Sequence, residues 1–108
     1  MEEQHSSNKS VSVGTSAVEV LPDLTNGQDV TGKRKAFVIT NTSTGGQKIS
    51  LSIGQNAVAN TGIILYPGGT WAEAVDPAFE PTNRNISGIA SAASGSVSVM
   101  ERINPNPQ

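Results

Sequence analysis

The stretch Arg34–Trp71 decides the fold and reads RKAFVITNTSTGGQKISLSIGQNAVANTGIILYPGGTW. It contains three runs rich in Val, Ile, Leu or Phe, at residues 33–41, 48–53 and 62–66. Each run stops at a cluster of Gly, Asn, Ser, Thr or Pro. Apolar runs bounded by turn-forming residues are typical of β-strands, so this stretch predicts three strands.

The spacing of apolar residues predicts which side of each strand faces the core. In the second run, apolar Ile49, Leu51 and Ile53 alternate with polar residues, which gives one apolar and one polar face. In the first run Ala36 and Val38 lie opposite the larger apolar residues, which predicts a strand covered on both sides. The residues expected to face inward are Phe37, Ile39, Leu51, Ile53, Ile63, Leu65, Val97 and Val99.

The same reasoning extends to the rest of the chain. Further strands are expected within 11–21, with a break or bulge at Gly14, and at 70–75, 86–92 and 96–101. The short Gly-rich link after Asn41 predicts an antiparallel hairpin between the first two runs. Helical periodicity is absent, so the sequence predicts an all-β chain folded as a single small antiparallel β-sandwich or jelly roll with flexible termini.

The domain organisation follows from length and polarity. A chain of 108 residues holds one hydrophobic core. Residues 1–10 are polar and predict an N-terminal arm, residues 11–103 predict the sandwich, and 104–108 predict a proline-containing tail. Only 4% of the residues are aromatic, and such a thin core suggests stabilisation by neighbouring subunits, as in a homo-oligomer.

Composition argues against several functions. The net charge of −2 gives no basic surface for nucleic acid or anionic membrane. No run is apolar enough for a membrane helix or a signal peptide, so a soluble protein made in a cytoplasm is expected. Without cysteine and with His5 as the single histidine, the usual nucleophile–base pairs and metal-ligand sets are missing. We therefore expect no enzyme activity, cofactor or metal.

Five residues are candidates for contacts with a partner. Tyr66 and Trp71 flank the Pro-Gly turn, where aromatic rings can anchor an interface or stack on a sugar. Trp71 could equally cap the core. The basic run Lys33, Arg34 and Lys35 is either a solvated strand end or a source of salt bridges to a partner's carboxylates.

One set of motifs resembles a known family. The order RKAFVITNTS, ISLSIG, GIILYPGGTW and ISGIASAASGSVSVME is similar to a small β-sandwich module of bacteriophage structural proteins. The matching residues are Arg34, Asn41, Ser43, Gly54, Gly62, Pro67, Gly68, Ile89, Ala90, Gly95, Val97, Val99 and Glu101. The resemblance implies a non-enzymatic virion protein, assembled in the host cytoplasm.

Three functions remain open from the sequence. The first is a capsid decoration or stabilising subunit that binds the major capsid protein or other virion subunits through many repeated contacts. The second is a vertex or fibre module that binds a receptor. The third, of a different class, is a carbohydrate-binding β-sandwich that uses Tyr66 and Trp71.

Overall fold

The computed structural model describes residues 5–22, 33–74 and 81–104. These residues contain eight strands, and no helix among them could cross a bilayer. The strands are β1 (His5–Val13), β2 (Val18–Leu21), β3 (Lys33–Asn41), β4 (Ile49–Ile53), β5 (Ile63–Leu65), β6 (Thr70–Ala74), β7 (Ile86–Ala90) and β8 (Gly95–Asn104).

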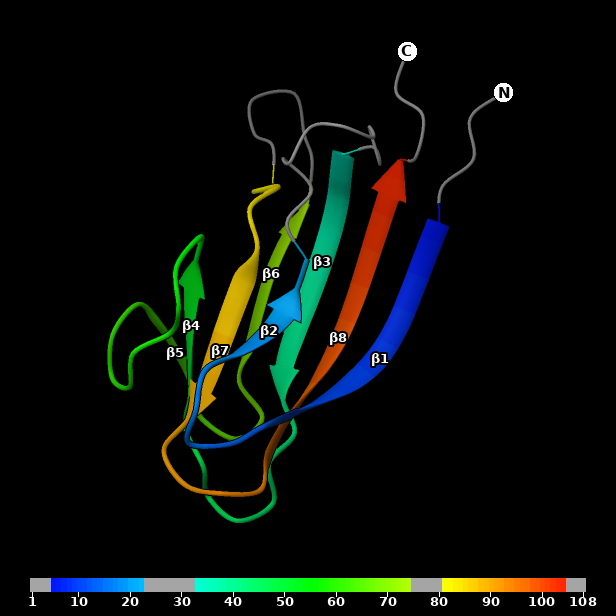
Figure 1. The fold of residues 1–108 in the computed structure, drawn as a ribbon. Coiled ribbons are helices and arrows are strands. Elements are labelled where there is room, and N and C mark those ends of the chain that lie inside the picture. The colour runs from blue at the N-terminus through cyan, green and yellow to red at the C-terminus, as the bar shows by residue number, and fades with distance from the viewer. Residues whose placement is uncertain (1–4, 23–32, 75–80, 105–108) are drawn as a thin grey trace.

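The strands form two four-stranded antiparallel sheets (Figure 1). Sheet A has the order β1-β8-β3-β6, and sheet B has the order β2-β7-β4-β5. The chain therefore pairs its first strand with its last, its second with its seventh, its third with its sixth and its fourth with its fifth. Such nested pairing over two packed sheets is a jelly roll. The predicted all-β sandwich is confirmed.

The predicted hairpin between the first two runs is wrong. β3 lies in sheet A between β8 and β6, whereas β4 lies in sheet B between β7 and β5. The Gly-rich link after Asn41 therefore crosses from one sheet to the other. Because both edges of β3 are occupied by strands from later in the sequence, β4 has no free edge of β3 to pair with. A short link fits a sheet crossing as well as a hairpin.

The predicted N-terminal arm 1–10 is wrong for residues 5–10, which belong to β1. This strand pairs with β8 without interruption from His5↔Ile103 to Val13↔Gly95. Strand pairing uses backbone groups, so an edge strand can form from a polar sequence that buries little apolar surface. The first predicted strand region, 11–21, is divided after Val13 between β1 and β2, which lie in different sheets.

The core lies between the two sheets and agrees with most of the predicted set. Phe37, Ile39, Leu51 and Val97 are fully buried. Ile53 is an exception, because it ends β4 and is 39% exposed. The cluster of buried apolar residues is Val13, Val20, Leu21, Phe37, Ile39, Ile49, Leu51, Leu65, Ile86, Ala90, Val97 and Val99.

Two glycines are required by this packing. At Gly88 in β7, an added Cβ would lie 3.0 Å from the Val20 side chain and 3.2 Å from that of Leu51. At Gly62, φ is 78° and an added Cβ would lie 2.4 Å from the Leu51 carbonyl oxygen. Only glycine accepts that backbone conformation without strain, so Gly62 fixes the turn from the β4–β5 loop into β5.

Candidate interaction surfaces

Arg34, predicted at a strand end open to solvent or to a partner, is buried at the start of β3. It is 2% exposed, and its Nε donates a 2.8 Å hydrogen bond to the Glu101 carboxylate on β8. Its other guanidinium nitrogens donate to the carbonyl oxygens of Pro22, Thr82 and Arg84. A buried arginine needs such partners because an unpaired buried charge is costly. Arg34 therefore joins β2, β3, β8 and the 81–85 segment, and is not available to a partner.

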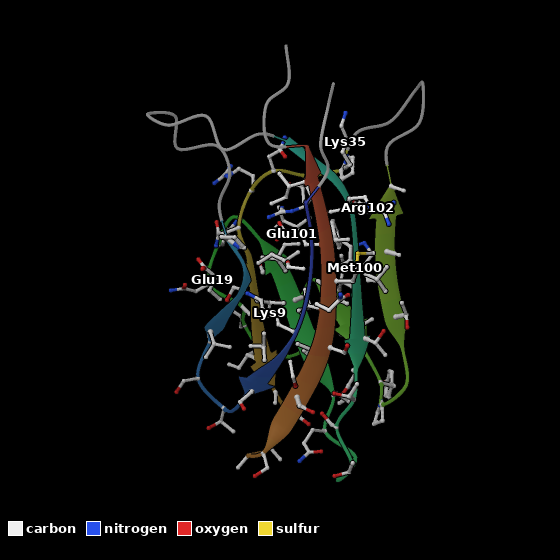
Figure 2. All side chains as sticks on the ribbon, turned by 90° about the vertical axis from the view of Figure 1, so that its right-hand side faces the viewer. Lys9, Glu19, Lys35, Met100, Glu101 and Arg102 are labelled. Atoms are coloured by element: carbon white, nitrogen blue, oxygen red, sulfur yellow. The ribbon has the colours of Figure 1, made fainter. Side chains whose placement is uncertain are left out.

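The other two basic candidates differ from Arg34. Lys33 begins β3, and its side chain lies outside the described residues. Lys35 occupies a bulge where the β3–β8 register shifts between Arg34 and Ala36. Figure 2 shows Lys35 near the same end of the molecule as Arg102. A role for Lys33 and Lys35 in binding a partner stays a prediction.

Asn41 holds the opposite end of β3, and only its place in the phage-like pattern had marked it in the sequence. It is 1% exposed. Its Nδ2 donates to the carbonyl oxygens of Gln47 and Leu65 at 2.8 Å each, and its Oδ1 accepts from the Ser43 backbone N–H. One uncharged amide thus joins the end of β3 to the start of β4 and the end of β5.

The two aromatic candidates have different environments. Trp71 on β6 is half-buried, and its ring packs edge-on against Phe37 with centroids 4.9 Å apart. Tyr66, just after β5, is 63% exposed, and the Lys48 ammonium lies 5.7 Å from its ring centre. Among the described residues the aromatic ring pair is Phe37–Trp71. Trp71 therefore caps the core, and Tyr66 is the accessible member.

No segment within residues 5–22, 33–74 and 81–104 covers the outer face of sheet A. Cross-strand neighbours place Val38, Met100, Ala72 and Asn8 in one row across its four strands. The next row, toward the Asn41 end, consists of the hydroxyl side chains Ser10, Ser98, Thr40 and Thr70. Within the described ranges the prediction that β3 is covered on both sides is therefore wrong, because Val38 and Ala36 are only half-buried.

The outer face of sheet B is partly covered by the β4–β5 loop. Backbone N–H groups of Ala57 and Asn60 donate to the hydroxyls of Ser87 and Ser50, which are both 3% exposed. These serines fill outward positions of β7 and β4. Serine side chains in a strand thus hold the loop down, whereas the outer face of sheet A has no such cover among the described residues.

The exposed large apolar side chains of the described residues all belong to one hairpin. They are Ile53, Val58, Ile64 and Tyr66, which are 39%, 59%, 37% and 63% exposed. Ile64 pairs with Ser50 and so points outward from sheet B, and Tyr66, just beyond the end of β5, lies beside the Lys48 ammonium. We call Val58, Ile64 and Tyr66 the hairpin patch. Sequence reasoning found only Tyr66, because Ile64 lies in an unbroken apolar run and Val58 lies in a loop.

No group of three or more His, Cys, Asp or Glu side chains in the described residues could hold a metal ion. Every buried side-chain nitrogen or oxygen in the same ranges has a hydrogen-bond partner. The buried polar groups are therefore fully used within the fold.

Comparisons with known proteins support the fold. No protein-family model and no curated protein matches the sequence. A search of solved structures finds a similar chain in Bacillus endospore appendages, described as a novel family of disulfide-linked pili. The similarity covers 97% of this chain and 89% of that chain, with a TM-score of 0.54 and 16% sequence identity. At this identity the match shows a common fold.

Proposed function

We propose that this protein is a non-enzymatic structural subunit that assembles with copies of itself. The observation that carries the proposal is the open edge of sheet A at β1. Among the described residues, this nine-residue strand pairs with β8 alone, and it contains no proline. Long unpaired edges are templates for strand pairing with another chain. The similarity to a chain from pili supports the same function.

Assembly of these 108 residues would differ from that of the pili in its chemistry. The sequence contains no cysteine, so these residues cannot form the disulfide links described for the appendages. Copies would be held together by backbone pairing and side-chain contacts. An assembly of this chain is therefore expected to persist under reducing conditions and to dissociate in denaturant.

Light scattering and negative-stain electron microscopy of the purified protein test the proposal. We expect the mass to increase with concentration, and we expect regular particles or filaments. Addition of dithiothreitol should not change either result. A monomer at every attainable concentration, with no regular object in micrographs, would contradict self-assembly.

A capsid decoration subunit is the second candidate, because the sequence resembles phage structural modules and jelly rolls are common in viral capsid domains. In this case the protein would occupy the surface of a virion and bind the major capsid protein. Purified phage particles mixed with the protein and separated on a density gradient would distinguish the two. Co-sedimentation at a fixed ratio, with no assembly of the protein alone, would favour decoration.

A further inference from the structure

The β1 edge has a counterpart in β6, the strand at the other edge of sheet A (Figure 1). Among the described residues β6 pairs with β3 alone. Each neighbouring pair of strands in sheet A is antiparallel, so β1 and β6 run in opposite directions. A second copy shifted within the plane of sheet A, without rotation, would therefore set its β1 antiparallel beside β6 and continue the alternation of the sheet.

The backbone groups that the two edges present are in matching phase. The Asn41 N–H donates to the Gly69 carbonyl oxygen, and the Thr42 N–H donates to the Ser96 carbonyl oxygen. Hydrogen-bonded and non-hydrogen-bonded pairs alternate along an antiparallel ladder. Continued through the registers of sheet A, this alternation directs backbone groups away from the sheet at Asn8, Ser10 and Ser12 of β1 and at Thr70, Ala72 and Ala74 of β6. Both sets lie on the outer face, so pairing between them also brings the inner-facing residues together.

The inner-facing side chains of the two edges are complementary. Opposite residues of an antiparallel ladder share a face. On β1, Lys9 and Val11 lie opposite buried residues of β8 and so face inward, and Figure 2 shows Lys9 on the side of β1 toward sheet B. On β6, Trp71 and Glu73 lie opposite buried residues of β3 and also face inward. Lys9 is exposed and the other three are half-buried, so each edge leaves one apolar and one charged side chain incompletely covered.

We infer that β1 of one copy pairs with β6 of the next, in the register that sets Lys9 opposite Glu73. Because the strands are antiparallel, the same register sets Val11 opposite Trp71. An ion pair and an apolar contact then form on the inner face, while backbone hydrogen bonds join the outer-facing residues. The two edges differ, so the contact is heterologous and repeats from copy to copy. This inference rests on the proposed self-assembly and adds to it the strand that β1 meets.

The charges around Glu73 agree with this pairing. Its Oε1 accepts a 3.3 Å hydrogen bond from the Thr82 backbone N–H, and a carboxylate can accept several bonds at once. On the same inner face Arg34 and Glu101 are already paired with each other. Arg102 neighbours Ala36 on the outer face. An incoming Lys9 ammonium therefore meets the carboxylate on its own side of the sheet.

The other edges fit β1 less well. β1 carries Lys9 and no carboxylate, so a second β1 offers this lysine no opposite charge. β5 has three residues, none of them charged. β2 has four, and its Glu19 is exposed next to the buried Val20, which places the carboxylate on the outer face. Among the described edge strands, β6 alone has an inner-facing carboxylate, and such charge complementarity favours it over the wrong partners.

Charge reversal tests the ion pair. Lys9→Glu and Glu73→Lys should each associate at least tenfold more weakly than the wild type in sedimentation velocity, because each sets like charges opposite one another. Mixed in equal amounts, the two variants should assemble together, since the β1 edge of each then meets an opposite charge on the β6 edge of the other. Arg102→Glu and Glu19→Lys change the net charge equally on the outer faces and should assemble normally.

Engineered cysteines test the register, because the 108 residues contain no cysteine of their own. The pairing sets Ser10 opposite Ala72 with Cα atoms about 5.5 Å apart, within the reach of a disulfide. In one chain these residues are three strand spacings apart, at least about 14 Å, and cannot be bridged. Oxidised Ser10→Cys/Ala72→Cys protein should therefore give a ladder of covalent multimers on a non-reducing gel. Ser12→Cys/Ala72→Cys, out of register, and Ser10→Cys alone should remain mostly uncrosslinked.

The outcomes separate this inference from the proposed function. Wild-type protein that remains monomeric would overturn both. If the wild type assembles but the Ser10–Ala72 ladder is absent, the pairing with β6 is wrong and self-assembly still stands. Efficient dimer formation by Ser10→Cys alone would place two β1 strands together and would also overturn the pairing. Circular dichroism melting identifies a charge variant that fails to fold, and the cysteine ladder then decides, since Ser10 and Ala72 are both exposed.

Discussion

The two ends of β3 are held by different chemistry. At the first end a charged guanidinium reaches a carboxylate and three backbone carbonyls, and at the other end an uncharged amide reaches two carbonyls and a backbone N–H. Both ends need a buried polar group because segments from both sheets leave or enter there with backbone groups to satisfy. The charged end therefore depends on the Arg34–Glu101 pair, and loss of either partner would leave a buried charge without its counterion.

The largest effect is expected from breaking the charged end. Arg34→Met leaves the Glu101 carboxylate and three carbonyl oxygens without their donor, and should lower the free energy of unfolding by about 3–5 kcal/mol. Urea denaturation of the variant and the wild type measures this change in the free energy of unfolding. Arg34→Lys keeps the positive charge, but its single ammonium cannot reach all the same partners. It should therefore lower the free energy of unfolding by less than Arg34→Met does. Equal midpoints for the wild type and Arg34→Met would show that Arg34 does not hold this end.

Breaking the neutral end should cost less. Asn41→Ala removes two donated hydrogen bonds and one accepted bond, and leaves no buried charge. The free energy of unfolding should fall by about 2–3 kcal/mol, again by urea denaturation. Thr42→Ala, next to it on the exposed side of the chain, is the matched control and should have little effect. If Asn41→Ala proved more damaging than Arg34→Met, the ranking of the two ends would be reversed.

Deletion of the start of β1 should destabilise the Arg34 end of β3 and β8 and leave the Asn41 end unchanged. Ser7 neighbours Glu101 across the β1–β8 ladder, so deletion of residues 1–8 uncovers β8 at the Arg34 end only. We expect a loss of about 1–2 kcal/mol, because ladder hydrogen bonds are replaced by bonds to water. Hydrogen exchange should increase in the last part of β8 and remain unchanged near Val97. Unaltered exchange would place residues 5–8 outside the sandwich.

The smallest expected effect is the coupling between the two ends. Residues 34 and 41 are seven positions apart on one strand, a separation of roughly 23 Å. Sites this far apart with no shared partner usually contribute independently. The double variant Arg34→Lys with Asn41→Ala should therefore equal the sum of the single losses within about 0.5 kcal/mol. A larger deviation would mean that β3 transmits strain from one end to the other.

The positions of most strands, and the residues of each strand that face inward, could be read from the order of residues along the chain. A strand alternates its side chains whatever it pairs with, so Phe37, Ile39 and Leu51 could be assigned to the core from spacing alone. Turn residues such as Gly62 and Pro67 also mark strand ends locally. The same reasoning missed the first part of β1, because pairing through backbone groups leaves no apolar pattern to read.

Which strands are neighbours, and which groups the buried polar residues bind, became known only from the packed fold. Arg34 and Glu101 are separated by 67 positions and become partners because the jelly roll places β8 beside β3. From the sequence, a basic residue at the start of a strand is expected to be solvated. The segments that bury Arg34 come from distant parts of the chain and are seen only in the folded structure. The hairpin patch likewise depends on the fold. Ile64 lies in an unbroken apolar run that is typical of a core strand, and the pairing of β5 at the edge of sheet B turns its side chain outward.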